Sequence, residues 1–111
     1  MGWNGVDLDG TLALYDGWVS EDHIGEPIPK MLDRVIKWLS EGKEVRIMTA
    51  RVSPQPGGGE SRARLAIQQW CMKHLGQILP VTCAKDYGMI ELWDDRAIQV
   101  IPNTGERADG K

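Results

Sequence analysis

The sequence predicts one α/β domain built on a doubly wound, mainly parallel sheet with helices on both faces. Short apolar segments of strand length alternate with two longer segments whose apolar residues recur at helical spacing. The chain has 111 residues, of which 41% are hydrophobic and 26% are charged. This length and composition suit one globular domain with a real core and are too small for two. We expect the domain to span residues 1–102 and a loose tail to follow at 103–111.

The first half of the chain predicts a strand, an irregular segment, a helix and a second strand. A strand at 3–8 carries apolar residues beside two aspartates. Residues 13–30 contain glycines and prolines, which favour an irregular excursion with room for a small hairpin around Tyr15 to Val19. Apolar residues at helical spacing then predict a helix at 30–41, and a strand follows at 44–49.

The second half begins with a glycine-rich loop at 54–61 and a second helix at 62–75, which Gly76 is suited to end. Short apolar segments then predict three further strands, at 80–84, 89–93 and 97–101. Helices that alternate with short apolar strands imply parallel pairing. In parallel sheets of this type, ligands bind at the carboxyl ends of the strands.

Composition and cysteine content limit the class of protein. A net charge of −3 argues against a general nucleic-acid coat protein. Cys71 and Cys83 are too sparse for a disulfide framework, so we expect both to be free and buried in a reducing compartment. No apolar run approaches the length of a membrane span, and the N-terminus lacks the basic and apolar regions of a signal peptide. These features predict a cytoplasmic protein without a membrane partner.

Polar side chains lie at the ends of four of the predicted strands. They are Asp7 and Asp9 at the end of the first strand, Thr49 and Arg51 at the end of the second, Lys85 at the end of the third, and Asp94 and Asp95 at the end of the fourth. Because the carboxyl ends of parallel strands meet at one edge of a sheet, we expect these groups to surround one pocket. So many carboxylates need a cation, and hard oxygen ligands suit Mg²⁺.

A magnesium site of this kind favours phosphoryl chemistry. Mg²⁺ with few protein ligands shares a phosphate, to which Thr49 offers a hydroxyl donor and Lys85 a positive charge. A carboxylate beside the metal can attack phosphorus and form an aspartyl-phosphate. A second carboxyl group, two residues further along, can protonate the leaving oxygen and later take a proton from water.

These residues resemble the motifs of the haloacid dehalogenase-like (HAD) superfamily. The segment DLDGTL resembles its first motif, VRIMTAR its second and IELWDDRA its fourth, while Lys85 suits the lysine of the third. The motifs occur in the family's order and cover the chain from about Val6 to Ile101. The resemblance implies a HAD-like Rossmannoid fold. The gaps at 13–29 and 50–84 are too short for the family's cap domain, so it implies a small capless member with a flap at 13–29.

The resemblance also implies a role for each matched residue. Asp7 would be the nucleophile and a Mg²⁺ ligand. Asp9 would be the general acid and base, with its backbone carbonyl also on the metal. Thr49 would hold the phosphate, and Lys85 would balance charge between phosphate and carboxylates. The acidic ligands of the fourth motif would be Asp94 and Asp95, the latter bound directly or through water.

Together these features predict a Mg²⁺-dependent phosphatase that cleaves a phosphomonoester. An aspartate at the position of Asp9 is typical of the family's phosphatases and phosphotransferases, because the dehalogenase branch lacks it. Capless members have an open site and often act on large substrates, or close the site by forming oligomers. We therefore expect a phosphorylated substrate, either a small molecule such as a nucleotide or a nucleic-acid end.

Two other functions and several residue roles stay open. A phospho-accepting receiver domain also groups aspartates, threonine and lysine at a sheet edge, although it places its carboxylates on different strands. A non-catalytic HAD-like binding module would keep the fold alone. Thr49 is either a phosphate contact or a helix cap, and Arg51 is either a substrate contact or a solvated side chain. Trp18 either stacks on a ring of the substrate or packs against the protein.

Overall fold

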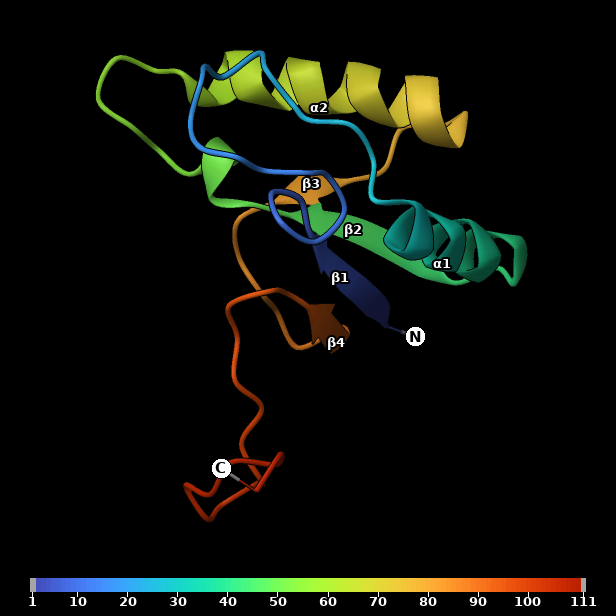
Figure 1. Ribbon diagram of the computed structural model, residues 1–111, viewed down its shortest axis with the longest axis vertical. Helices are drawn as coiled ribbons and strands as arrows, with labels where there is room; N and C mark the ends of the chain where they lie inside the picture. Colours follow the sequence, from blue (N-terminus) through green and yellow to red (C-terminus); the bar gives the residue numbers. More distant parts are fainter. Residues whose placement is uncertain (1, 111) are drawn as a thin grey trace.

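The computed structural model describes residues 2–110 and has an α/β architecture (Figure 1). Its elements begin and end within two residues of the expected bounds, apart from the last expected strand. In chain order they are β1 (Trp3–Asp7), α1 (Pro29–Ser40), β2 (Glu44–Met48), the 3₁₀ helix η1 (Ala50–Val52), α2 (Glu60–Leu75), β3 (Val81–Thr82) and β4 (Met89–Trp93).

The strands form one parallel sheet in the order β3-β2-β1-β4. Register pairs Val6 of β1 with Ile47 of β2 on one side and with Trp93 of β4 on the other. The α/β class with a parallel, Rossmann-like sheet is therefore confirmed, and the described chain carries no cap domain. The carboxyl ends of β1, β2 and β4 lie at one edge of the sheet, which is where such folds bind ligands.

The hydrophobic core lies between one face of the sheet and both helices. Val6, Val45 and Ile47 alternate along β1 and β2 and are at most 1% exposed. Apolar side chains of the helices pack into the same cluster, namely Met31, Val35 and Trp38 from α1 and Ile67, Trp70 and Cys71 from α2. Each fully buried side chain of this size stabilises the fold by about 1.5–3 kcal/mol. The core thus fixes β1 and β2 beneath the helices and holds their carboxyl ends in place.

Both helices lie on the same face of the sheet (Figure 1), so the expectation of helices on both faces is wrong. The opposite face carries residues 83–88, the loop between β3 and β4, instead of a helix. Trp3 points to this face, where its indole Nε1 donates to Asp86 Oδ1 at 2.8 Å. The Arg46 guanidinium lies 4.5 Å from the centre of the Trp3 ring and completes the cover. A helical crossover needs a dozen residues or more, so this six-residue link can only pass over the sheet as a loop.

The expected strand at 97–101 is wrong. The described chain has only an isolated antiparallel bridge there, between Val100 and Arg107. The backbone N–H of Arg96 donates to Asp94 Oδ1 at 2.8 Å, and after this turn the chain leads away from the sheet (Figure 1). Ile98 and its apolar neighbours are therefore exposed. Alternating apolar residues favour a strand only where a neighbouring strand pairs with them.

The tail expected at 103–111 belongs to a local turn as far as Gly110, and its last residue lies outside the described range. The N–H of Ala108 donates to the carbonyl of Gln99 at 2.9 Å, and that of Ile101 donates to Glu106 at 2.8 Å. These bonds join both sides of the expected domain boundary at residue 102.

The flap, which we define as residues 13–28, leaves and rejoins the core at one place. The N–H of Leu14 donates to the Glu26 carbonyl, and that of Ile28 to the Leu12 carbonyl, both at 2.8 Å. An isolated bridge of Ala13 with Pro27 closes the loop, and the small hairpin suggested by the sequence does not form. The flap rests on α2, since Trp70 Nε1 donates to the Gly25 carbonyl at 3.0 Å.

Candidate active site

A pocket of about 720 Å³ lies at the carboxyl ends of β1, β2 and β4. Six of the seven residues expected to form a site line it, namely Asp7, Asp9, Thr49, Arg51, Asp94 and Asp95. The flap contributes Tyr15, Trp18 and Glu21 to its wall. The parallel sheet therefore brings together side chains that are far apart in the sequence, as the strand ends predicted.

Three carboxylates converge on one side of this pocket. Asp7 is the last residue of β1, and Asp94 and Asp95 directly follow β4, the strand that pairs with β1. Each of the three offers a carboxylate oxygen, and these oxygens all lie within 4.8 Å of one another. Like charges this close repel one another unless a proton or a cation lies between them.

The environment of Asp7 raises its pKa to about 7, from an ordinary value of 3.8. Burial is the largest cause, because it disfavours the charged form. A hydrogen bond with Asp95 and the negative charges of Asp94 and Asp95 raise the pKa further, while a hydrogen bond from Thr11 lowers it. Without a cation the cluster therefore holds a proton near neutral pH.

The turn after β1 has the shape that this cluster needs. Gly10 has a φ of +90°, and a Cβ atom there would lie 2.6 Å from Asp95 Oδ2. Glycine adopts this positive φ without strain, and its lack of a Cβ atom leaves room for the Asp95 carboxylate. The Thr11 hydroxyl lies 3.3 Å from Asp7 Oδ2 and 3.3 Å from Asp95 Oδ1, so it can donate to either carboxylate. Gly10 and Thr11 were not expected as site residues, although the DGT segment that contains them was the available signal.

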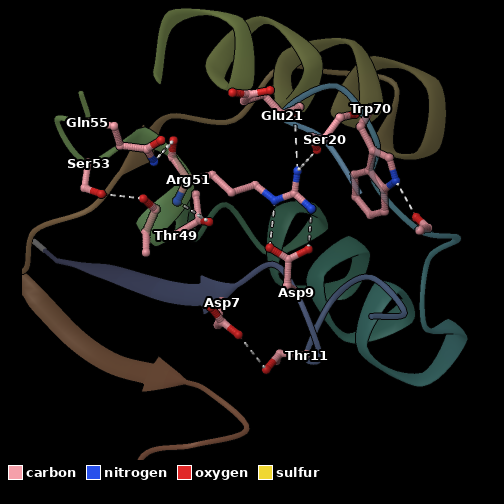
Figure 2. Close-up of polar contacts among 12 residues, drawn as sticks. Asp7, Asp9, Thr11, Ser20, Glu21, Thr49, Arg51, Ser53, Gln55 and Trp70 are labelled. Atoms are coloured by element: carbon pink, nitrogen blue, oxygen red, sulfur yellow. Dashed lines mark hydrogen bonds and ion pairs between the residues drawn. The ribbon is translucent and has the colours of Figure 1, made fainter. Parts of the chain in front are cut away.

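Asp9 points away from the cluster and forms a two-pronged ion pair with Arg51 (Figure 2). Arg51 Nε donates to Asp9 Oδ2 at 2.7 Å, and Nη2 donates to Oδ1 at 2.8 Å. The side chain of Arg51 is only 5% exposed and that of Asp9 is 20% exposed. Arg51 is therefore not a solvated side chain, which was one of the two roles left open for it.

Thr49 is buried at the end of β2 and caps η1. Its Oγ1 accepts a hydrogen bond from the backbone N–H of Arg51 at 3.2 Å. This turn directs Arg51 back toward Asp9. Since the Thr49 oxygen accepts here, its own proton is free to be donated into the pocket. The cap and the phosphate contact, which were posed as alternatives, are thus compatible.

Lys85 does not join the other expected residues. It is exposed, it lies three residues beyond the end of β3, and it is not part of the pocket wall. Arg96 lines the pocket instead, one residue after the clustered carboxylates. Among the described residues that line this pocket, the positive charges are those of Arg51 and Arg96.

The two cysteines are free, as expected, but only Cys71 is buried. Cys83 is exposed and lines the pocket, because it lies just past the short strand β3 and not within it.

Two aromatic side chains of the flap face the pocket. Tyr15 is 44% exposed and Trp18 is 55% exposed. The Arg51 guanidinium lies 4.9 Å from the centre of the Trp18 ring, so Trp18 partly covers the ion pair. The remaining ring surface is open to a ligand.

Comparison with known proteins shows the fold alone. No family model and no curated protein matches the chain. A solved structure, that of a conserved protein from Bacteroides thetaiotaomicron, is similar with a TM-score of 0.55 and 19% identity over 90% of this chain and 80% of that one. None of the described helices is long and apolar enough to cross a membrane.

Proposed function

We propose that the protein is a Mg²⁺-dependent phosphohydrolase that cleaves a phosphomonoester through an aspartyl-phosphate, as its resemblance to the HAD superfamily implies. The observation that carries the proposal is the convergence of Asp7, Asp94 and Asp95, whose oxygens lie within 4.8 Å of one another. This cluster faces a pocket that also contains the Thr49 hydroxyl and the Asp9 carboxylate. The residues proposed as nucleophile, proton donor and phosphate contact therefore all line one pocket, which supports the proposal.

The residues of the cluster fit Mg²⁺. Hard carboxylate oxygens are its usual protein ligands. The raised pKa of Asp7 indicates that the three carboxylates do not all stay ionised near neutral pH unless a cation offsets their negative charge. Asp7, Asp94 and Asp95 would hold the metal, with the backbone carbonyl of Asp9 as a further ligand. The metal would neutralise charge on the phosphoryl group and keep Asp7 ionised near neutral pH.

The chemistry then needs two steps from the chain's own residues. In the first, an Asp7 oxygen attacks phosphorus and the bond from phosphorus to the leaving oxygen breaks, while Asp9, the carboxylate partner of Arg51, relays a proton from the monoanionic ester to the leaving oxygen. In the second, water attacks the phosphorus of the aspartyl-phosphate and gives its proton to Asp9, which passes it to the departing phosphate. Inorganic phosphate leaves, and both carboxyl groups return to their starting states.

Thr49 and Arg96 are suited to hold the phosphate. The free proton of the Thr49 hydroxyl can be donated to a phosphate oxygen at the end of β2. Arg96 lines the pocket and supplies the positive charge that was expected from Lys85. We therefore assign to Arg96 the charge-balancing role in this protein.

The pocket suits a phosphate ester that carries a planar ring, such as a nucleotide or a nucleic-acid end. Its volume of about 720 Å³ is within the range of small-molecule sites, roughly 300–1,000 Å³. The exposed rings of Tyr15 and Trp18 lie at its wall and offer faces on which a base can stack.

Release of inorganic phosphate from a panel of esters tests the proposal. The panel contains an aryl phosphate, 3′- and 5′-nucleotides, sugar phosphates and phosphorylated DNA ends, each with Mg²⁺ and with EDTA. We expect turnover that EDTA and Asp7→Asn abolish. Asp33→Asn, which removes an exposed carboxylate on α1, is the matched control and keeps full activity.

Absence of turnover in a folded wild-type protein that binds Mg²⁺ would contradict the proposal. A stable phosphoryl group on Asp7 would then favour the receiver domain. If Asp7 takes up no phosphate either, a non-catalytic binding module is favoured.

A further inference from the structure

We propose that Arg51 is a positioning residue that fixes the orientation of the Asp9 carboxyl group and couples it to the flap, and that Arg51 is not a ligand of the phosphate. The inference rests on the proposed phosphatase function. It assigns to Arg51 a role in the proton-transfer step and none in substrate binding.

The hydrogen-bond donors of Arg51 carry the first part of the inference. A guanidinium group has five N–H donors. Nε and Nη2 each donate to Asp9, and the two hydrogens of Nη1 serve the carbonyls of Ser20 and Glu21, both at 3.3 Å. A single N–H is left, whereas two-pronged recognition of a phosphate needs two. Arg51 as placed is therefore committed to the protein.

The burial of Arg51 also argues against a direct contact with the phosphate. The Arg51 side chain is 5% exposed, while the Asp9 side chain keeps 20% of its surface open. A substrate can thus reach Asp9 more easily than it can reach Arg51. Both Asp9 oxygens accept from Arg51, so the plane of the carboxyl group is fixed by the rigid guanidinium fork. Proton transfer depends on such orientation, because a small misplacement of the donor slows the step strongly.

The flap residues around Trp18 are linked to the Asp9 carboxylate through Arg51. Trp18 lies over the guanidinium at 4.9 Å, and the carbonyls of Ser20 and Glu21 accept from its Nη1. The carbonyls of Ser20 and Glu21 hold one end of the guanidinium, and its other end holds Asp9 (Figure 2). A change at Trp18, Ser20 or Glu21 therefore reaches the Asp9 carboxylate through Arg51.

Substrates with different leaving groups distinguish a role of Arg51 in proton transfer from a role in phosphate binding. An aryl oxygen leaves readily without a proton, whereas an alkyl oxygen needs the general acid. A residue that acts through Asp9 affects alkyl phosphates far more than aryl phosphates. A phosphate ligand affects both alike and raises KM.

The experiment measures kcat and KM of the Mg²⁺-loaded protein with one aryl and one alkyl phosphate. We expect Asp9→Asn to lower kcat for the alkyl ester by about 100-fold or more and for the aryl ester by less than about 10-fold. Arg51→Gln follows the same pattern with KM nearly unchanged, and Arg51→Lys, which keeps the charge but loses the fork, recovers only part of the loss. The double variant Asp9→Asn/Arg51→Gln has the same kcat as Asp9→Asn, because Arg51 acts on the reaction through Asp9.

Two exposed flap positions test the coupling without disturbing the core. Trp18→Leu removes the ring over Arg51 and lowers the ratio of alkyl to aryl kcat by about 3-fold or more, whereas Val19→Ala leaves this ratio unchanged. The values of kcat are compared at saturating substrate, because loss of stacking on Trp18 changes KM for the aryl ester. Val19 is exposed and lies outside the pocket of about 720 Å³, although it lines a smaller neighbouring pocket, and its side chain takes no part in the contacts that hold Arg51, so it is the matched control.

Equal losses on both esters, a raised KM in Arg51→Gln, or additive effects in the double variant would overturn the inference. So would a Trp18→Leu variant with the wild-type ratio, which remains measurable even if Arg51→Gln fails to fold. A wild type that cleaves neither ester would contradict the proposed function itself and the inference with it, whereas a cleaving wild type with an unchanged ratio in the variants contradicts the inference alone.

Discussion

Replacing Asp7 by asparagine should make the metal-free protein more stable at neutral and higher pH, although it removes the nucleophile. The cause is the raised pKa of Asp7, about 7 against an ordinary 3.8, which follows mainly from burial and from its neighbours Asp95 and Asp94. At a pH between 3.8 and about 7, Asp7 keeps its proton in the folded state but has lost it in the unfolded chain. Wild-type stability therefore falls as the pH rises from about 4 to about 7, and the loss is complete above that range.

The size of the effect follows from the pKa difference. The interval between 3.8 and about 7 corresponds to about 4 kcal/mol at roughly 1.4 kcal/mol for each pH unit. Asp7 keeps part of its surface in water, and solvent screening reduces the effect, so we expect roughly 2 kcal/mol. Asparagine has the same shape and cannot ionise, so Asp7→Asn gains this amount above about pH 7 and nothing below about pH 4.

Urea unfolding in EDTA at about pH 4, 6 and 8 measures this gain as a difference in the free energy of unfolding. Asp33→Asn is the control and should show no gain that depends on pH. Added Mg²⁺ should reverse the order at high pH, because it stabilises a folded state that binds it and Asp7→Asn lacks a ligand. An Asp7→Asn variant no more stable than the wild type at about pH 8, or one equally stabilised at about pH 4, would refute the reasoning.

Three further predictions concern the metal, the turn after β1 and the positive charges. Mg²⁺ affinity measured by calorimetry should fall about 5-fold between pH 7 and pH 6, because the metal must displace the proton held by the cluster; an affinity independent of pH would contradict this. Gly10→Ala should lower the free energy of unfolding by about 1–3 kcal/mol, because position 10 has a φ of +90°. It should also lower the Mg²⁺ affinity, because the alanine Cβ would lie 2.6 Å from Asp95 Oδ2 and displace this ligand. Arg96→Ala should raise KM for a phosphate ester more than Lys85→Ala does, because only Arg96 lines the pocket; the opposite order in steady-state kinetics would restore Lys85 to the site.

The sequence predicted the gathering of carboxylates because it depends only on strand order and direction. Asp7 ends β1, and Asp94 follows β4, so parallel pairing alone brings them to one edge. The DGT segment likewise marked a tight turn, which requires Gly10. The carboxylate cluster and this turn depend on the course of the backbone, which hydrophobic periodicity and turn residues predict.

Features that depend on side-chain direction or on partners could not be predicted from the sequence. The pairing of Asp9 with Arg51 requires the capped turn of η1 to direct Arg51 inward, which the spacing of the residues does not reveal. Lys85 misses the pocket because β3 ends earlier than its apolar run suggests. Residues 97–101 have the pattern of a strand, but the turn at Asp94 leads them away from the strand that could have paired with them.

The place of β4 at the edge of the sheet has a consequence for how the protein opens and assembles. β4 pairs only with β1 within the described sheet, and it precedes the two carboxylates that repel Asp7. In the absence of a cation and above about pH 7, where Asp7 has lost its proton, this repulsion acts to separate β4 from β1, so amide hydrogens of β4 exchange with solvent before those of β2. A cation bound by all three aspartates would instead join the first strand to the last. The pocket is then completed only when the C-terminal part of the chain has left the ribosome and docked.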